Sequence, residues 1–104
     1  MNTYCVSFRI AAETVGGKTY DERWESLVLA ARKADAGFWD GTTSFFLVES
    51  GLDTNTFAKS LTAGLSKSHD MLVVFDPADM SMAYFGAVKE TAALESFFKF
   101  KTKL

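Results

Sequence analysis

The chain has very few of the residues that build disulfides, metal clusters and rigid turns. Among 104 residues there is one cysteine, Cys5, one histidine, His69, and one proline, Pro77. A single cysteine excludes an intramolecular disulfide, and one cysteine with one histidine cannot supply the ligands of a structural zinc site. We therefore expect neither a disulfide scaffold nor a metal centre, and no cofactor.

Long apolar runs and an excess of positive charge are also absent. No stretch approaches the ~20 apolar residues that span a bilayer. The segment from Met1 to Arg9 lacks the basic start and apolar run of a secretion signal, so we expect a cytoplasmic protein that does not contact the membrane. The net charge of −2 argues against a dedicated nucleic-acid binder but allows a local basic patch.

Aromatic residues are abundant: they make up 14% of the chain, and ten of them are phenylalanine. A chain of this length is one domain by size and buries roughly 60–70% of its unfolded surface. The phenylalanine content indicates either a dense core or rings that pack against a second chain.

Residues 43–49 predict a strand that is covered on both sides, because apolar residues stand at both parities. They are Phe45 and Leu47 on one face, and Phe46 and Val48 on the other. The preceding Asp40-Gly41 dipeptide favours a tight hairpin turn. We therefore expect a short strand over 37–40 that pairs with the strand at 43–49.

Residues 3–10 alternate between apolar and polar and predict the first strand, and the apolar run 71–75 predicts another. Thr19, with Glu22 three residues on, fits a capping box at the start of a helix that ends near Gly37. Its apolar stripe would be Trp24, Leu27, Val28 and Ala31.

A second helix is expected from Asp53 or Thr54, with an apolar face that runs from Phe57 to Leu65. After a turn at 76–79, residues 82–88 favour a short strand. A helix capped by Thr91 would follow, although the alternation at 98–101 is equally typical of a strand.

The order β-α-β-β-α-β predicts an α+β fold of the ferredoxin-like type, a four-stranded antiparallel sheet with two helices on one face. Residues 1–104 would form this single domain, with a core at 3–76 and a C-terminal appendix at 82–104. Two helices leave the other sheet face bare, with either Phe45 and Leu47 or Phe46 and Val48 upon it. Such a patch needs a cover, which is either the appendix or a second copy in a homodimer.

The strands at 4–10, 44–50 and 70–74 read YCVSFRI, SFFLVES and DMLVV. Over residues 3–76 the chain resembles small bacterial proteins related to the small CRISPR-associated subunit of the spacer-acquisition complex, and among them a SinR-like branch. The resemblance implies a ferredoxin-like dimer with nucleic acid as a candidate partner. In that group an aspartate near the end of the first strand is the proposed metal ligand of a nuclease. Here Arg9 stands at the matching position, and a guanidinium repels magnesium, so the nuclease role is not carried over.

Four basic residues are candidate nucleic-acid contacts, and the alternative for each is an ordinary solvated charge. Arg9, at the end of the first strand, could anchor a phosphate or form an ion pair. Lys99, Lys101 and Lys103 alternate with Phe98 and Phe100, a pattern that suits stacking on single-stranded nucleic acid but also suits a sealed sheet edge.

The remaining polar candidates favour structural roles. His69 reads as a loop residue, Cys5 as a small interface residue without an activating cation, and Asp76 and Asp79 as turn formers. Three hypotheses result: a non-enzymatic homodimer that binds nucleic acid or protein, a metal-dependent endonuclease or endoribonuclease that uses Asp70, Asp76 or Asp79, and an inert subunit of a larger assembly such as a defence or mobile-element system.

Overall fold

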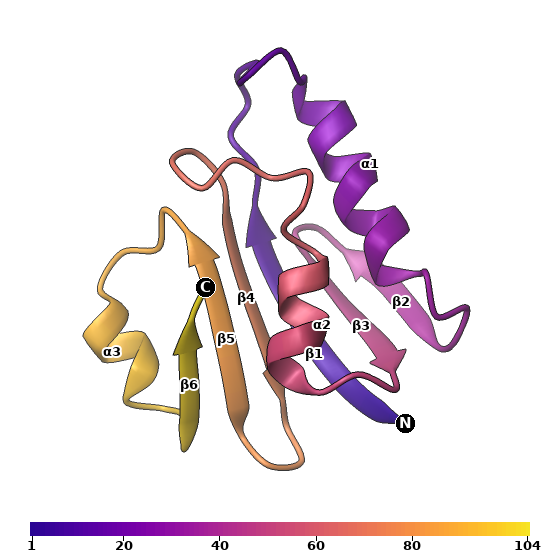
Figure 1. Ribbon diagram of the computed structural model, residues 1–104, viewed down its shortest axis with the longest axis vertical. Coiled ribbons are helices and arrows are strands. Elements are labelled where there is room, and N and C mark those ends of the chain that lie inside the picture. The colour runs from indigo at the N-terminus through magenta and orange to yellow at the C-terminus, as the bar shows by residue number, and fades with distance from the viewer.

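Six strands and three helices form an α+β fold in the computed structural model, which describes residues 1–104 (Figure 1). The elements are β1 (Asn2–Arg9), α1 (Tyr20–Ala31), β2 (Phe38–Thr42), β3 (Phe45–Ser50), α2 (Thr54–Ser60), β4 (Met71–Asp76), β5 (Ser81–Gly86), α3 (Thr91–Glu95) and β6 (Phe100–Lys103).

All six strands belong to one mixed sheet with the order β2-β3-β1-β4-β5-β6. The first five strands along the chain pair antiparallel, whereas β6 pairs parallel with β5. The sheet is therefore larger than the four antiparallel strands expected, because the C-terminal appendix adds β5 and β6 to one edge.

The helix α1 begins with the predicted capping box: Thr19 accepts from the Glu22 amide, and Glu22 accepts from the Thr19 amide. It ends at Ala31, earlier than the predicted end near Gly37. The predicted apolar stripe is rotated, because the buried row is Arg23, Leu27 and Ala31, while Trp24 is exposed.

The hairpin between β2 and β3 also differs from the prediction. Asp40 and Gly41 lie within β2, and the turn falls at Thr43-Ser44, where Ser44 adopts a φ of 57°. A register irregularity between Trp39 and Thr42 accommodates the difference. The Asp-Gly dipeptide is thus part of a bulged strand rather than of a tight turn.

The later helices are short. Of the two capping residues expected, Asp53 caps α2, with its carboxylate accepting from the Thr56 amide at 2.8 Å, while Thr54 is the first residue of the helix. Thr91 begins α3 but does not cap it, since the cap position is Glu90, which has a φ of 51°. The appendix contains both of the alternatives left open by the sequence, a helix at Thr91–Glu95 and then a strand at Phe100–Lys103.

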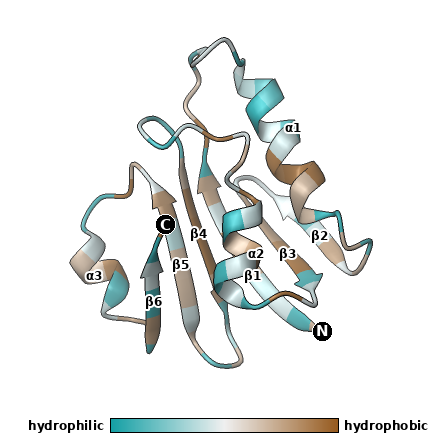
Figure 2. Ribbon diagram, in the orientation of Figure 1, coloured by the Kyte–Doolittle hydropathy of each residue, from teal (hydrophilic) through white to brown (hydrophobic).

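The main core lies between the sheet and the helices α1 and α2, which lie on one side of it (Figure 1). We call this side the near face. Figure 2 shows strongly hydrophobic segments along the inner strands, such as β4, and in the later turns of α1. The near-face core contains Tyr4, Val6, Phe8, Leu27, Ala31, Phe46, Val48, Phe57, Ala58, Leu61, Leu72, Val74 and Ala83.

A second, smaller core lies on the opposite side of the sheet, the far face. There Val73 of β4 and Met82 and Tyr84 of β5 are buried beneath the appendix. The covering side chains are Val88, Leu94 and Phe98. Tyr84 Oη donates a hydrogen bond of 2.6 Å to Glu95 Oε2, which fastens α3 to the sheet.

Candidate interaction face

The appendix covers only the β4–β5 half of the far face. The half formed by β2, β3 and β1 has no helix upon it, and we call it the open half. Phe45, Leu47 and Cys5 are partly exposed there, and Trp39 is 50% exposed. A sheet normally buries one face and solvates the other with polar side chains, so apolar groups on an open face mark a contact surface.

Strand pairing aligns the apolar side chains of the open half into one row across the sheet. Trp39 pairs with Leu47, Leu47 with Cys5, and Cys5 with Phe75. Phe75 ends the row against the appendix, where its ring centroid lies 5.3 Å from that of Phe98. The row therefore runs from an exposed indole at one edge to an aromatic corner beneath α3.

The indole of Trp39 lies over Gly41 of the same strand. A Cβ added to Gly41 would come within 2.4 Å of Trp39 Cζ2, so the ring lies over a position that only glycine leaves free. Tryptophan is enriched among the residues that contribute most to binding energy, which suits the half-exposed Trp39 as an anchor.

Cys5 lies near the middle of the row. Burial, with a smaller contribution from the Asp76 carboxylate, raises the pKa of the Cys5 thiol. The neutral thiol therefore dominates at physiological pH, and Cys5 is a packing residue of the surface rather than an activated nucleophile.

Alternate side chains of β3 lie on opposite faces of the sheet. Phe46 and Val48 are buried in the near-face core, so they are not available for contact with a partner. Phe45 and Leu47 point to the far face and remain available for contact. This selects one of the two patches that the sequence had left open.

The predicted basic residues do not gather into one patch. Arg9 ends β1, while Lys101 and Lys103 lie on β6, with β4 and β5 between them. Three strand spacings correspond to roughly 14 Å. Lys99 is exposed beside the C-terminal edge, where its Nζ lies 5.9 Å from the centroid of the Phe100 ring.

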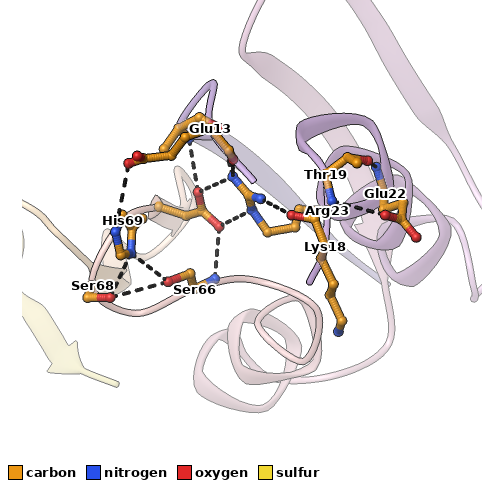
Figure 3. Close-up of polar contacts among 10 residues, drawn as sticks. Glu13, Lys18, Thr19, Glu22, Arg23, Ser66, Ser68 and His69 are labelled. Carbon is orange, nitrogen blue, oxygen red and sulfur yellow. Dashed lines mark hydrogen bonds and ion pairs between the residues drawn. The ribbon is translucent and has the colours of Figure 1, made fainter. Parts of the chain in front are cut away.

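The strongest polar contact of the fold was not predicted from the sequence. Arg23 and Asp70 form an ion pair of 3.0 Å between Nε and Oδ2, and their side chains are 1% and 0% exposed. Figure 3 shows Arg23 directed from α1 toward the loops that carry Glu13 and Ser66. The pair connects α1 to the residue that precedes β4.

Backbone groups complete the hydrogen bonding of this pair. The Arg23 guanidinium donates to the carbonyls of Lys18, at 2.7 Å, and of Ala11, at 2.7 Å. The Asp70 carboxylate accepts from the amides of Ala11 and Ser66 at 2.9 and 2.8 Å. No buried side-chain polar atom in the chain lacks a partner, so the pair is a structural clamp with no free group for chemistry.

The sequence carried one usable signal for this clamp. An arginine four residues before Leu27 and eight before Ala31 stands on a helical row with buried apolar residues. Its partner is 47 residues away in the chain and cannot be deduced from spacing.

The other acidic and histidine candidates also occupy structural positions. Asp76 accepts from the Ala78 amide, and Asp79 accepts from the Ser81 amide, as turn formers do. His69 lies 3.7 Å from Glu13, in an exposed loop pair (Figure 3). The fold brings no three histidine, cysteine or acidic side chains together in a group that could hold a metal ion.

Comparison with known proteins gives no relative. No protein-family model, no curated protein and no solved structure matches the chain. No helix of the chain has the length and apolar character required to cross a lipid bilayer.

Proposed function

We propose that the chain is a non-enzymatic, homodimeric domain of the ferredoxin-like type that acts by association, and that its open half is the dimer surface. The observation that carries this proposal is the row Trp39, Leu47 and Cys5 on the half of the far face that the appendix leaves bare, with Phe75 at the border of the appendix. The strand order β2-β3-β1-β4, with helices after β1 and β3, supports the ferredoxin-like assignment.

The appendix limits how a second copy docks. The helix α3 packs on the far face next to the open half, through Leu94. If the two-fold axis lay between the sheets and perpendicular to the strands, the α3 helices of the two copies would face each other. An axis parallel to the strands avoids this contact. It places Trp39 of each copy against Phe75 of the other, and Leu47 against Cys5, so that the contact is isologous.

The test is the molar mass in solution, measured by light scattering after size exclusion over a concentration series. We expect a dimer for the native chain and a monomer for Leu47→Lys, which places a charge in the centre of the row. Leu29→Lys is the matched control, because Leu29 is exposed on α1, away from the far face. A native chain that remains monomeric at high concentration would refute the proposal.

Cys5 allows a second test. Packed sheets lie about 10 Å apart, with side chains filling the space between them, so a dimer shields Cys5 in the middle of the row from a reagent. We expect the native chain to react slowly with a maleimide at concentrations where it is dimeric, and the Leu47→Lys variant to react faster. Equal rates for the two chains would contradict the proposed surface.

Single-stranded nucleic acid is the second candidate partner, favoured by the C-terminal edge. Phe97 and Phe100 are largely exposed there, next to Lys99, Lys101 and Lys103. Fluorescence anisotropy of a labelled oligonucleotide at rising salt tests this candidate, and Lys101→Glu with Lys103→Glu should abolish binding. The same incubation with magnesium tests the nuclease alternative, since cleavage lost in Asp76→Asn would favour an enzyme.

A further inference from the structure

A small pocket lies between α1 and the β2–β3 hairpin. Its volume is about 200 Å³. Drug-sized ligands occupy pockets of about 300–1,000 Å³, so this pocket has room for a head group rather than for a whole large ligand. The lining residues are Phe8, Tyr20, Trp24, Val28, Asp40, Thr42, Thr43, Ser44, Phe45 and Phe46.

One wall is a helical row in which Tyr20, Trp24 and Val28 follow one another at intervals of four residues. Tyr20 is 40% exposed and Trp24 is 38% exposed. Trp24 is exposed because the orientation of α1 that buries Arg23 turns Trp24 out of the core and to the edge of the pocket. Two aromatic side chains thus keep surface that faces the pocket.

The floor of the pocket is also aromatic. Phe8 and Phe46 lie there in the near-face core, with ring centroids 5.4 Å apart, and both are buried. Phe45 borders the pocket at the start of β3, but its side chain points to the far face, so the rings of the pocket are those of Tyr20, Trp24, Phe8 and Phe46.

Asp40 is the only charged residue that lines the pocket. Its side chain takes part in neither of the two ion pairs of the chain, which are Arg23–Asp70 and His69–Glu13. No lysine or arginine lines the pocket, so Asp40 gives it a negative charge, next to the π-systems of Tyr20 and Trp24.

We propose that this pocket binds an organic cation of the methylated ammonium class. Ring faces attract such a cation through their quadrupoles, and aromatic cages of this kind recognise quaternary ammonium groups. The Asp40 carboxylate adds an opposite charge. A hard inorganic cation would require several oxygen ligands in place of aromatic rings, so magnesium and calcium do not suit this lining. The proposal does not depend on dimerisation.

The test uses tetramethylammonium as the cation and neopentane-like 3,3-dimethylbutan-1-ol as a neutral probe of similar shape. In a Trp39→Phe background, Trp24 is the only tryptophan, and its fluorescence reports the pocket. We expect saturable quenching by tetramethylammonium and at least tenfold weaker binding of the neutral alcohol. Equal binding of the two probes would reduce the pocket to an apolar crevice, and no saturation would refute the site.

Two variants complete the test. Asp40→Asn keeps the shape and should weaken tetramethylammonium several-fold while leaving the alcohol unchanged. Trp24→Leu should abolish binding. Because this variant lacks the fluorescent reporter, its binding is measured by saturation-transfer NMR on the methyl signal of the ligand. Leu29→Ala on the exposed side of α1 is the control and should bind as the native chain does. Native affinity in both Asp40→Asn and Trp24→Leu would contradict the proposal.

Discussion

Arg23 on α1 and Asp70 before β4 join two parts of the chain through an ion pair of 3.0 Å that is shielded from solvent. The same guanidinium reaches the carbonyls of Ala11, Glu13 and Lys18, so one side chain organises the whole connection between β1 and α1. The clamp replaces the apolar contact that a leucine would make in this row of the helix.

Removal of either partner should destabilise the fold strongly. Arg23→Met leaves the buried Asp70 carboxylate without an opposite charge. Asp70→Asn leaves the buried Arg23 guanidinium without one. Each should lower the free energy of unfolding by about 3–5 kcal/mol, measured by urea denaturation. The double variant should lose less than the sum of the two, and an additive loss would show that the pair is not coupled.

Gly86 should be intolerant of a side chain. Its φ is 90°, and a Cβ built there would lie 2.0 Å from the carbonyl oxygen of Asp70. We expect Gly86→Ala to cost more than about 1 kcal/mol, since the backbone conformation alone disfavours L-residues by that amount. Gly51→Ala is the control, because nothing lies within 4 Å of its added Cβ. Equal unfolding midpoints for the two variants would contradict this prediction.

Protonation of the Asp53 carboxylate in acid should lower the free energy of unfolding. Hydrogen bonds from the Thr56 amide hold the pKa of Asp53 below its ordinary value of 3.8. A lowered pKa in the folded state stabilises above the ordinary value, and this contribution disappears as the pH falls through the folded-state pKa. Urea midpoints at pH 7 and pH 3 should differ less for Asp53→Asn, which keeps the cap but does not titrate. An unchanged difference would assign the acid sensitivity to other carboxyl groups.

The hydrogen bond from Tyr84 to Glu95 should control the mobility of the appendix. Tyr84→Phe removes the donor, so we expect faster amide exchange over residues 87–99 with little change at β1. The hydrogen bond to Glu95 also raises the pKa of Tyr84 above 10.0, so this contact is complete below pH 10 and is lost as the pH rises further. Tyr20→Phe is the control, because the Tyr20 hydroxyl forms no hydrogen bond within the chain and lies outside the appendix.

The strands could be predicted because their signal is local. Alternation located β1, and apolar residues at both parities of 45–48 correctly placed β3 inside the sheet. The capping box at Thr19 was equally local and was confirmed. Each of these signals depends on neighbours within a few residues, where spacing determines geometry.

The errors arose where distant residues decide the structure. Trp24 was assigned to the core of α1 because of its side chain, whereas the buried position belongs to Arg23, whose partner Asp70 lies far along the chain. The aromatic pocket beside Trp24 was not predicted for the same reason, because the sequence placed Trp24 in the core. The Asp40-Gly41 turn was misplaced because the pairing of β2 with β3 overrides a dipeptide preference.

The parallel strand β6 covers the outer edge of β5. Its backbone groups occupy the outer edge of β5, and Leu104 at its end donates its amide to the Tyr84 carbonyl and packs against the near-face core. Loss of these few residues, by proteolytic trimming for example, would uncover an apolar ribbon over Ser81–Gly86. An unpaired edge of this kind is a template for pairing with other chains, so we expect removal of the four residues of β6 to increase aggregation.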